Sequence, residues 1–118
     1  MGYYSGWNAD YPSASTFYNP LLSCAQAQLM LANPESSYNP SLYCNPALER
    51  SVARARGLEP SDPGQARRVW IGIDRAVTSD APLIFTDNPR FVSLVSRRVK
   101  NYQSTAGLGP LYDQLWVQ

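Results

Sequence analysis

Hydrophobic positions recur at helical spacing between Asp62 and Pro82. The repeating positions lie three and four residues apart and predict one amphipathic helix; they are Ala66, Val69, Trp70, Ile73, Ala76 and Val77. Asp62 followed by Pro63 and then Gln65 is typical of a capped helix start, and Pro82 is expected to close the helix. Trp70 belongs to the apolar stripe, so we expect it in the core.

A second helix is predicted to begin at Asn45, a favoured cap residue, with Pro46 in the first helical position. Leu48, Val52 and Ala55 form its apolar stripe, and Gly57 is expected to end it. Its remaining face is charged and is interpreted as solvated; it comprises Glu49, Arg50, Arg54 and Arg56.

The remaining segments give weaker patterns. We predict a short strand ending before Pro12, a helical turn capped by Ser15 or Thr16 and interrupted by Pro20, and a helical piece over Gln26–Leu31. The run "PLIFTDNPRFVSLVS" predicts two strands, or one strand continued after a crossover. Residues 97–110 are predicted as a loop, and "LYDQLWVQ" as a terminal strand. This order fits a small α/β or α+β unit, or part of a larger sheet.

Composition removes several classes of function. The 118 residues suffice for one domain, and ten Lys and Arg against nine Asp and Glu offer no basic surface for nucleic acid. The chain has no histidine, which removes the commonest general base and zinc ligand. The spacing of the carboxylates selects no catalytic pair, so we expect no enzyme, no metal and no cofactor. No signal peptide follows Met1, so an exported protein would carry its signal upstream.

The two cysteines, Cys24 and Cys44, lie too far apart for a CxxC metal or redox motif. Two interpretations remain at this point: a disulfide in an oxidising compartment, or two buried thiols in a reducing one. The segment between them is rich in Asn, Pro and Ser and is typical of a loop.

Asp10 is the candidate binding residue because it stands between aromatic residues in the stretch "GWNADYP". A carboxylate beside Trp7 and Tyr11 is partly desolvated, which strengthens its attraction for a cation such as an α-amino group. The alternative is an Asp that hydrogen-bonds its own backbone in a turn before Pro12. Both interpretations stand on these residues alone.

Six stretches, in this order, resemble the C-terminal part of the family 5 extracellular solute-binding proteins, the dipeptide and oligopeptide receptors of ABC importers. They are "GWNADYP", "LLSC", "YCNPALERSVARA", "DPGQARRVWIGIDRAVTSDAPLI", "NPRFVSLVSRRVKNYQ" and "LYDQLWV". The resemblance covers nearly the whole chain. It implies a C-terminal segment of a bilobal periplasmic-binding-protein-like α/β fold, α+β in isolation, with helices packed on a partial mixed sheet.

The resemblance also implies a division of the chain. Residues 1–88 would form part of the C-terminal lobe, with the ligand loop and two helices. The crossover is placed around Thr86 to Arg90, across this boundary, and residues 89–118 would hold its second part and strands of the N-terminal lobe. An isolated segment of this kind would expose sheet edges and favour homodimers.

The function implied by the resemblance is capture of extracellular peptides by lobe closure, without chemistry. Asp10 matches the residue that anchors the peptide's α-amino group, Trp7 matches one that lines a side-chain pocket, and Ala9 and Tyr11 belong to the same ligand loop. The partners implied are a peptide or other small solute and a membrane permease. The location implied is the periplasm or the outer face of the cell membrane, with a lipid anchor in the full-length protein. A Cys24–Cys44 disulfide is similar to one in some members.

A different class of function also fits the sequence. A small secreted interaction module could use its aromatic residues as a stacking surface for sugars or a protein partner; these residues are Tyr3, Tyr4, Trp7 and Tyr11.

Overall fold

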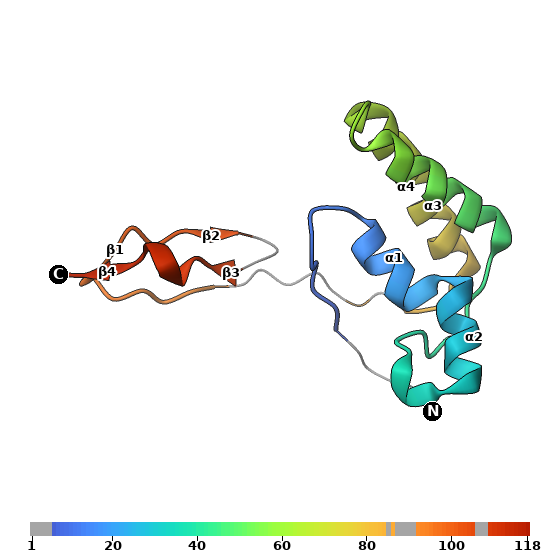
Figure 1. The fold of residues 1–118 in the computed structure, drawn as a ribbon, viewed down its shortest axis with the longest axis horizontal. Helices are drawn as coiled ribbons and strands as arrows, with labels where there is room; N and C mark the ends of the chain where they lie inside the picture. The colour runs from blue at the N-terminus through green and yellow to red at the C-terminus, as the bar shows by residue number, and fades with distance from the viewer. Residues whose placement is uncertain (1–5, 85, 87–91, 106–108) are drawn as a thin grey trace.

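The structure is a computed structural model that describes residues 6–84, 86, 92–105 and 109–118. Its two longest helices pack against each other. They are α3 (Pro46–Leu58) and α4 (Pro63–Asp80), which lie side by side in Figure 1. Both predicted caps are confirmed: Asn45 accepts hydrogen bonds from the first turn of α3, and Asp62 accepts one from the Gln65 N–H. The stripes predicted for the two helices meet in the core.

The predicted helix ends need small corrections. Gly57 does not end α3, because it keeps right-handed helical backbone and the helix runs on to Leu58, with Glu59 as its C-cap. α4 ends where predicted: Ala81 takes a left-handed conformation with φ of 49°, and Pro82, which cannot continue the helix, follows it.

Two shorter helices, α1 (Ser15–Leu22) and α2 (Cys24–Ala32), precede the helix pair, and a single 3₁₀ turn, η1 (Pro34–Ser36), follows α2. The prediction that Pro20 interrupts the first helix is wrong, because α1 continues through it for two more residues. A proline there loses one hydrogen bond and crowds the preceding turn. Burial of Tyr18 and Leu22 against α3 and α4 offsets that cost.

The hydrophobic core lies where α1 meets α3 and α4. Its buried members are Tyr18, Leu22, Leu48, Val52, Ala55, Ile73 and Val77, with Leu21, Tyr43, Val69, Trp70, Ala76 and Leu83 packed around them. Trp70 is half-buried at the edge of this core, so its expected place is confirmed in part.

The C-terminal part contains two small antiparallel ribbons. β1 (Val99–Lys100) pairs with β4 (Trp116–Val117), and β2 (Ser104–Thr105) pairs with β3 (Gly109–Pro110); a 3₁₀ turn, η2 (Tyr112–Gln114), lies between β3 and β4. Residues 97–110 were predicted as a loop, and this prediction is wrong where the segment forms β1, β2 and β3. The predicted terminal strand is reduced to β4.

The described residues form an α+β unit, as expected at that level, but with no mixed sheet. Both ribbons are antiparallel, and the helices pack on one another instead of on a sheet; Figure 1 shows the ribbons apart from the helices. No helix in this part of the chain has the length and apolar character needed to cross a membrane.

The strands predicted after Pro82 are not found in the part of that run that the structure describes. Their apolar side chains face solvent: Ile84 is 92% exposed, Val92 85% and Leu94 99%. The predicted boundary at residues 88 and 89, and the crossover except Thr86, lie outside the described residues. So do Tyr3 and Tyr4.

Candidate functional site

Asp10 is tied to the first turn of α1 through Thr16. The backbone N–H of Asp10 donates to Thr16 Oγ1 at 3.0 Å, and that hydroxyl donates to Asp10 Oδ2 at 3.1 Å. Thr16 is buried, whereas Asp10 is exposed. The alternative interpretation expected the Asp10 side chain to hydrogen-bond its own backbone in a turn before Pro12. The side chain instead accepts a hydrogen bond from Thr16, in the helix that follows. This arrangement holds the carboxylate beside the N-terminus of α1, where negative charge is favoured.

Trp7 packs against Tyr38, which lies between α2 and α3. The two ring centroids are 5.1 Å apart at an interplanar angle of 61°, an edge-to-face contact. The indole Nε1 of Trp7 is buried and has no hydrogen-bond partner among the described residues. Tyr38, which the sequence did not single out, thus fixes one end of the predicted ligand loop.

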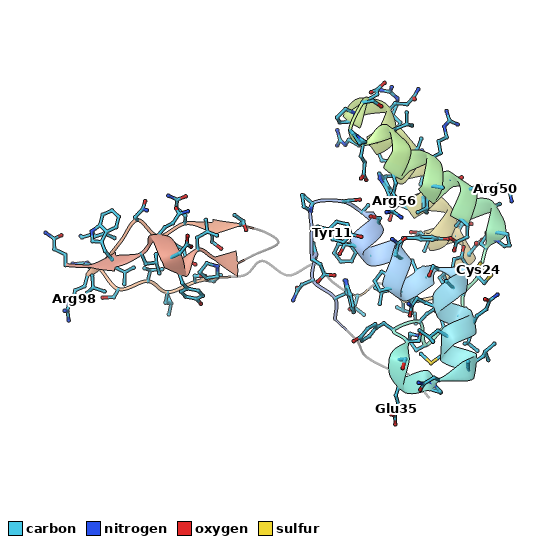
Figure 2. All side chains as sticks on the ribbon, viewed as in Figure 1. Tyr11, Cys24, Glu35, Arg50, Arg56 and Arg98 are labelled. Carbon is cyan, nitrogen blue, oxygen red and sulfur yellow. A yellow bond between two sulfur atoms is a disulfide. The ribbon has the colours of Figure 1, made fainter. Side chains whose placement is uncertain are left out.

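Tyr11 and Ala9 complete the four predicted binding residues. The Tyr11 hydroxyl is 3.1 Å from Ser15 Oγ, and its ring lies beside α1 (Figure 2), while Ala9 is half-buried. The side chains of Trp7, Asp10 and Tyr11 therefore reach three different partners. The structure keeps these residues in one continuous segment rather than gathering them around one cavity.

Glu59 joins this segment to the helix pair, and no sequence pattern pointed to it. Its Oε1 accepts hydrogen bonds from Ser13 Oγ at 2.6 Å and from Trp70 Nε1 at 2.8 Å. Ser13 Oγ also lies 2.9 Å from Ser15 Oγ. A continuous path of hydrogen bonds therefore runs from Tyr11 to the side of α4.

A shallow groove of about 360 Å³ borders this path. It is lined by Pro12, Ser13, Ala14, Glu59, Pro63, Ala66, Arg67 and Trp70. The groove combines apolar walls with one carboxylate and one guanidinium. None of the four predicted binding residues lines it, so it is separate from the surface of Asp10.

Cys24 and Cys44 form a disulfide, with 2.10 Å between the sulfurs and 4.3 Å between the Cα atoms. The pairing implied by the family resemblance is confirmed, and the alternative of two free thiols is wrong. The bond joins the first residue of α2 to the residue before the Asn45 cap of α3. Glu49 supports the same junction, because its Oε1 accepts the Cys24 N–H at 2.8 Å.

The segment between the cysteines is held by a buried amide, that of Asn39. This side chain is fully buried: its Nδ2 donates to the carbonyls of Ser23 and Tyr43 at 3.2 and 2.9 Å, and its Oδ1 accepts from Ser41. The sequence alone predicts only that this residue lies in a loop. The loop is in fact held by an internal polar anchor.

Two tyrosines have raised pKa values. Burial, and then the nearby Glu49 carboxylate, raise the pKa of Tyr18 well above its usual range, and the Tyr18 hydroxyl has no partner in the described structure. Partial burial, followed by the hydrogen bond to Asp80, raises the pKa of Tyr43. Both phenols stay protonated at neutral pH, so neither provides an anionic base.

Among the described residues, no three His, Cys, Asp or Glu side chains gather as a metal site. Comparison with known proteins finds no family model, no curated protein and no solved structure that matches this chain.

Proposed function

We propose that this chain is a segment of the substrate-binding component of a peptide-type ABC importer, which captures extracellular peptides by lobe closure. The observation that carries the proposal is the exposed Asp10 carboxylate, held at the start of α1 by Thr16 in a segment whose other end packs through Trp7. The ordered resemblance of six stretches to the peptide receptors supports it.

Asp10 suits the α-amino group of a peptide. Thr16 engages Oδ2, and Oδ1 is available to a ligand cation that offers three donors. An exposed ion pair contributes little on its own, because water screens it. Closure of a second lobe over the site would exclude that water and strengthen the attraction. Selectivity for a free N-terminus would come from geometry more than from raw affinity.

The exposed apolar residues after α4 also support a segment of a larger fold. Val92 and Leu94 are almost fully exposed, and β-branched and aliphatic residues in an extended run normally pack within a sheet. In the proposed receptor this run would pair with strands of the other lobe.

The disulfide supports a location outside the cytoplasm, because such bonds persist in oxidising compartments. A membrane permease would then receive the captured peptide.

The direct test measures binding of trialanine and N-acetyl-trialanine to the complete protein by calorimetry, with and without Asp10→Asn. We expect the substitution to weaken trialanine binding much more than binding of the acetylated peptide. Asp113→Asn, in the exposed turn η2, is the matched control and should change neither. Equal losses for both peptides would refute the anchor role, and no binding of either peptide would refute the proposed function.

A small interaction module is a second candidate, supported by the exposure of Tyr38 (61%), whose ring packs against Trp7, and by the exposure of Tyr11 (44%). Such a surface could stack against sugars. It predicts that the 118-residue chain alone is a stable monomer that binds an oligosaccharide such as maltotriose, and that Tyr38→Ala abolishes this binding.

A further inference from the structure

We infer that Glu59 is the positioning residue for the loop that carries Asp10, an inference that rests on the proposed function for its link to peptide binding. Glu59 lies outside the loop, at the C-terminus of α3, and is 46 residues from Ser13 along the chain. It would act on the ligand only through the loop.

The geometry places Glu59 on the rigid side of the contact. Trp70 packs against the core from α4 and donates its Nε1–H to Glu59 Oε1 at 2.8 Å. This bond and the helix C-terminus together restrict the carboxylate. A fixed acceptor can order whatever donates to it, because less side-chain freedom is lost when the bond forms.

On the loop side, the contact is made by the hydroxyl of Ser13, which also hydrogen-bonds to Ser15. Ser13 Oγ donates to Glu59 Oε1 at 2.6 Å, a short distance typical of a hydrogen bond to a charged acceptor. The same oxygen accepts the Ser15 N–H at 3.1 Å and contacts Ser15 Oγ at 2.9 Å. Ser15 is followed by Thr16, and Thr16 binds Asp10. By fixing Ser13, Glu59 therefore fixes the position in which the Asp10 carboxylate is held.

Loss of this contact should loosen the loop and leave the helices intact. The core is formed by other side chains of α1, α3 and α4, and Glu59 fills none of it. The contact is therefore a local one whose removal separates order in the loop from stability of the fold.

Amide hydrogen exchange followed by NMR tests the first step. In Glu59→Ala, the amides of Asp10, Ser13 and Ser15 should exchange roughly tenfold faster, while those of α3 and α4 keep wild-type rates. Glu59→Gln keeps an Oε1 acceptor and should restore most of the protection. Glu35→Gln, at an exposed glutamate in η1, is the control that should change nothing.

Ser13→Ala provides a second variant, because it removes the donor to Glu59 and leaves the bond between Glu59 and Trp70 in place; it also removes the acceptor of the Ser15 N–H. The amides of Asp10 and Ser13 should therefore exchange faster in this variant, as expected for Glu59→Ala. Unchanged exchange of these two amides in Glu59→Ala, or equal acceleration throughout the chain, would overturn the inference.

Peptide binding to the complete protein tests the second step. Glu59→Ala should weaken trialanine binding severalfold, and this loss should shrink when Asp10→Asn is already present, because the two changes act on one interaction. Full additivity would overturn the positioning role. If the wild type binds no trialanine, the proposed function fails, and the exchange rates still decide whether Glu59 orders the loop.

Discussion

The Tyr43 hydroxyl donates a hydrogen bond to Asp80 Oδ2, joining the residue that precedes the disulfide cysteine Cys44 to the last residue of α4. Asn45 Nδ2 donates to the same oxygen at 3.2 Å. The carboxylate at the end of α4 therefore connects the entry of α3 to the exit of α4, and the helix pair is fastened at that end by polar contacts.

We expect Tyr43→Phe to lower the free energy of unfolding by about 0.5–1 kcal/mol, the net value of one largely exposed hydrogen bond. Urea unfolding followed by circular dichroism measures it. Tyr112→Phe, at a tyrosine that is 76% exposed, is the control and should have no effect. A loss as small as that of the control would mean that the bond to Asp80 contributes nothing to stability.

Tyr18→Phe should leave stability at neutral pH unchanged or slightly higher, because the buried hydroxyl has no partner in the described structure. Burial raises the Tyr18 pKa above its ordinary value of 10.0. The unfolded chain therefore ionises first, so wild-type stability is fully present below about pH 10 and falls as the pH rises toward the folded-state pKa.

The Tyr18→Phe variant should escape this part of the alkaline loss. Unfolding free energies at about pH 7 and about pH 11 for both proteins give the comparison. A stability decline of the same size in both proteins would contradict the assigned cause, and a clear loss at neutral pH would show that the hydroxyl is hydrogen-bonded in solution.

Asn39→Ala should destabilise the chain by about 2–3 kcal/mol, because two backbone carbonyls would lose their buried donor. The exposed Asn33, which bonds to Ser36, offers the matched control: Asn33→Ala should cost well under 1 kcal/mol. Thermal unfolding of the two variants ranks them. Similar midpoints would show that the Asn39 anchor is not needed for stability.

Removing the disulfide with the double change Cys24→Ser, Cys44→Ser should lower the free energy of unfolding by about 3 kcal/mol, because the unfolded chain regains the freedom that the closed loop denies it. The Asn39 contacts remain in this variant, so we expect a folded protein with a lower midpoint rather than an unfolded chain. Urea unfolding with and without a reducing agent checks both points, since reduction should affect the wild type only.

Sequence reasoning worked best where the signals were local. The caps at Asn45 and Asp62 and the apolar stripes of α3 and α4 depend on residues within a few positions of one another. The strands predicted after Pro82 are not found among the described residues of that run, because β-propensity acts through pairing and burial and those residues lie in no described strand.

The candidate site shows the same limit. Asp10 and Thr16 are six residues apart, and a bond between an Asp and the start of a following helix is within reach of local reasoning. Ser13 and Glu59 are 46 residues apart, and Trp7 and Tyr38 meet only through the path of the chain between them. Contacts of this kind follow from the packing of α1 on the helix pair, which no short pattern encodes.

The Cys24–Cys44 bond has one more consequence: it makes the polypeptide between the two cysteines a covalent ring. That ring displays Leu31, Tyr38 and Leu42 at its surface, side chains that proteases of broad apolar specificity recognise. A single cut there would leave both new ends attached to the same molecule, which would migrate as one band until a reducing agent separated it into two. Cleavage within this ring therefore does not release either half of the protein.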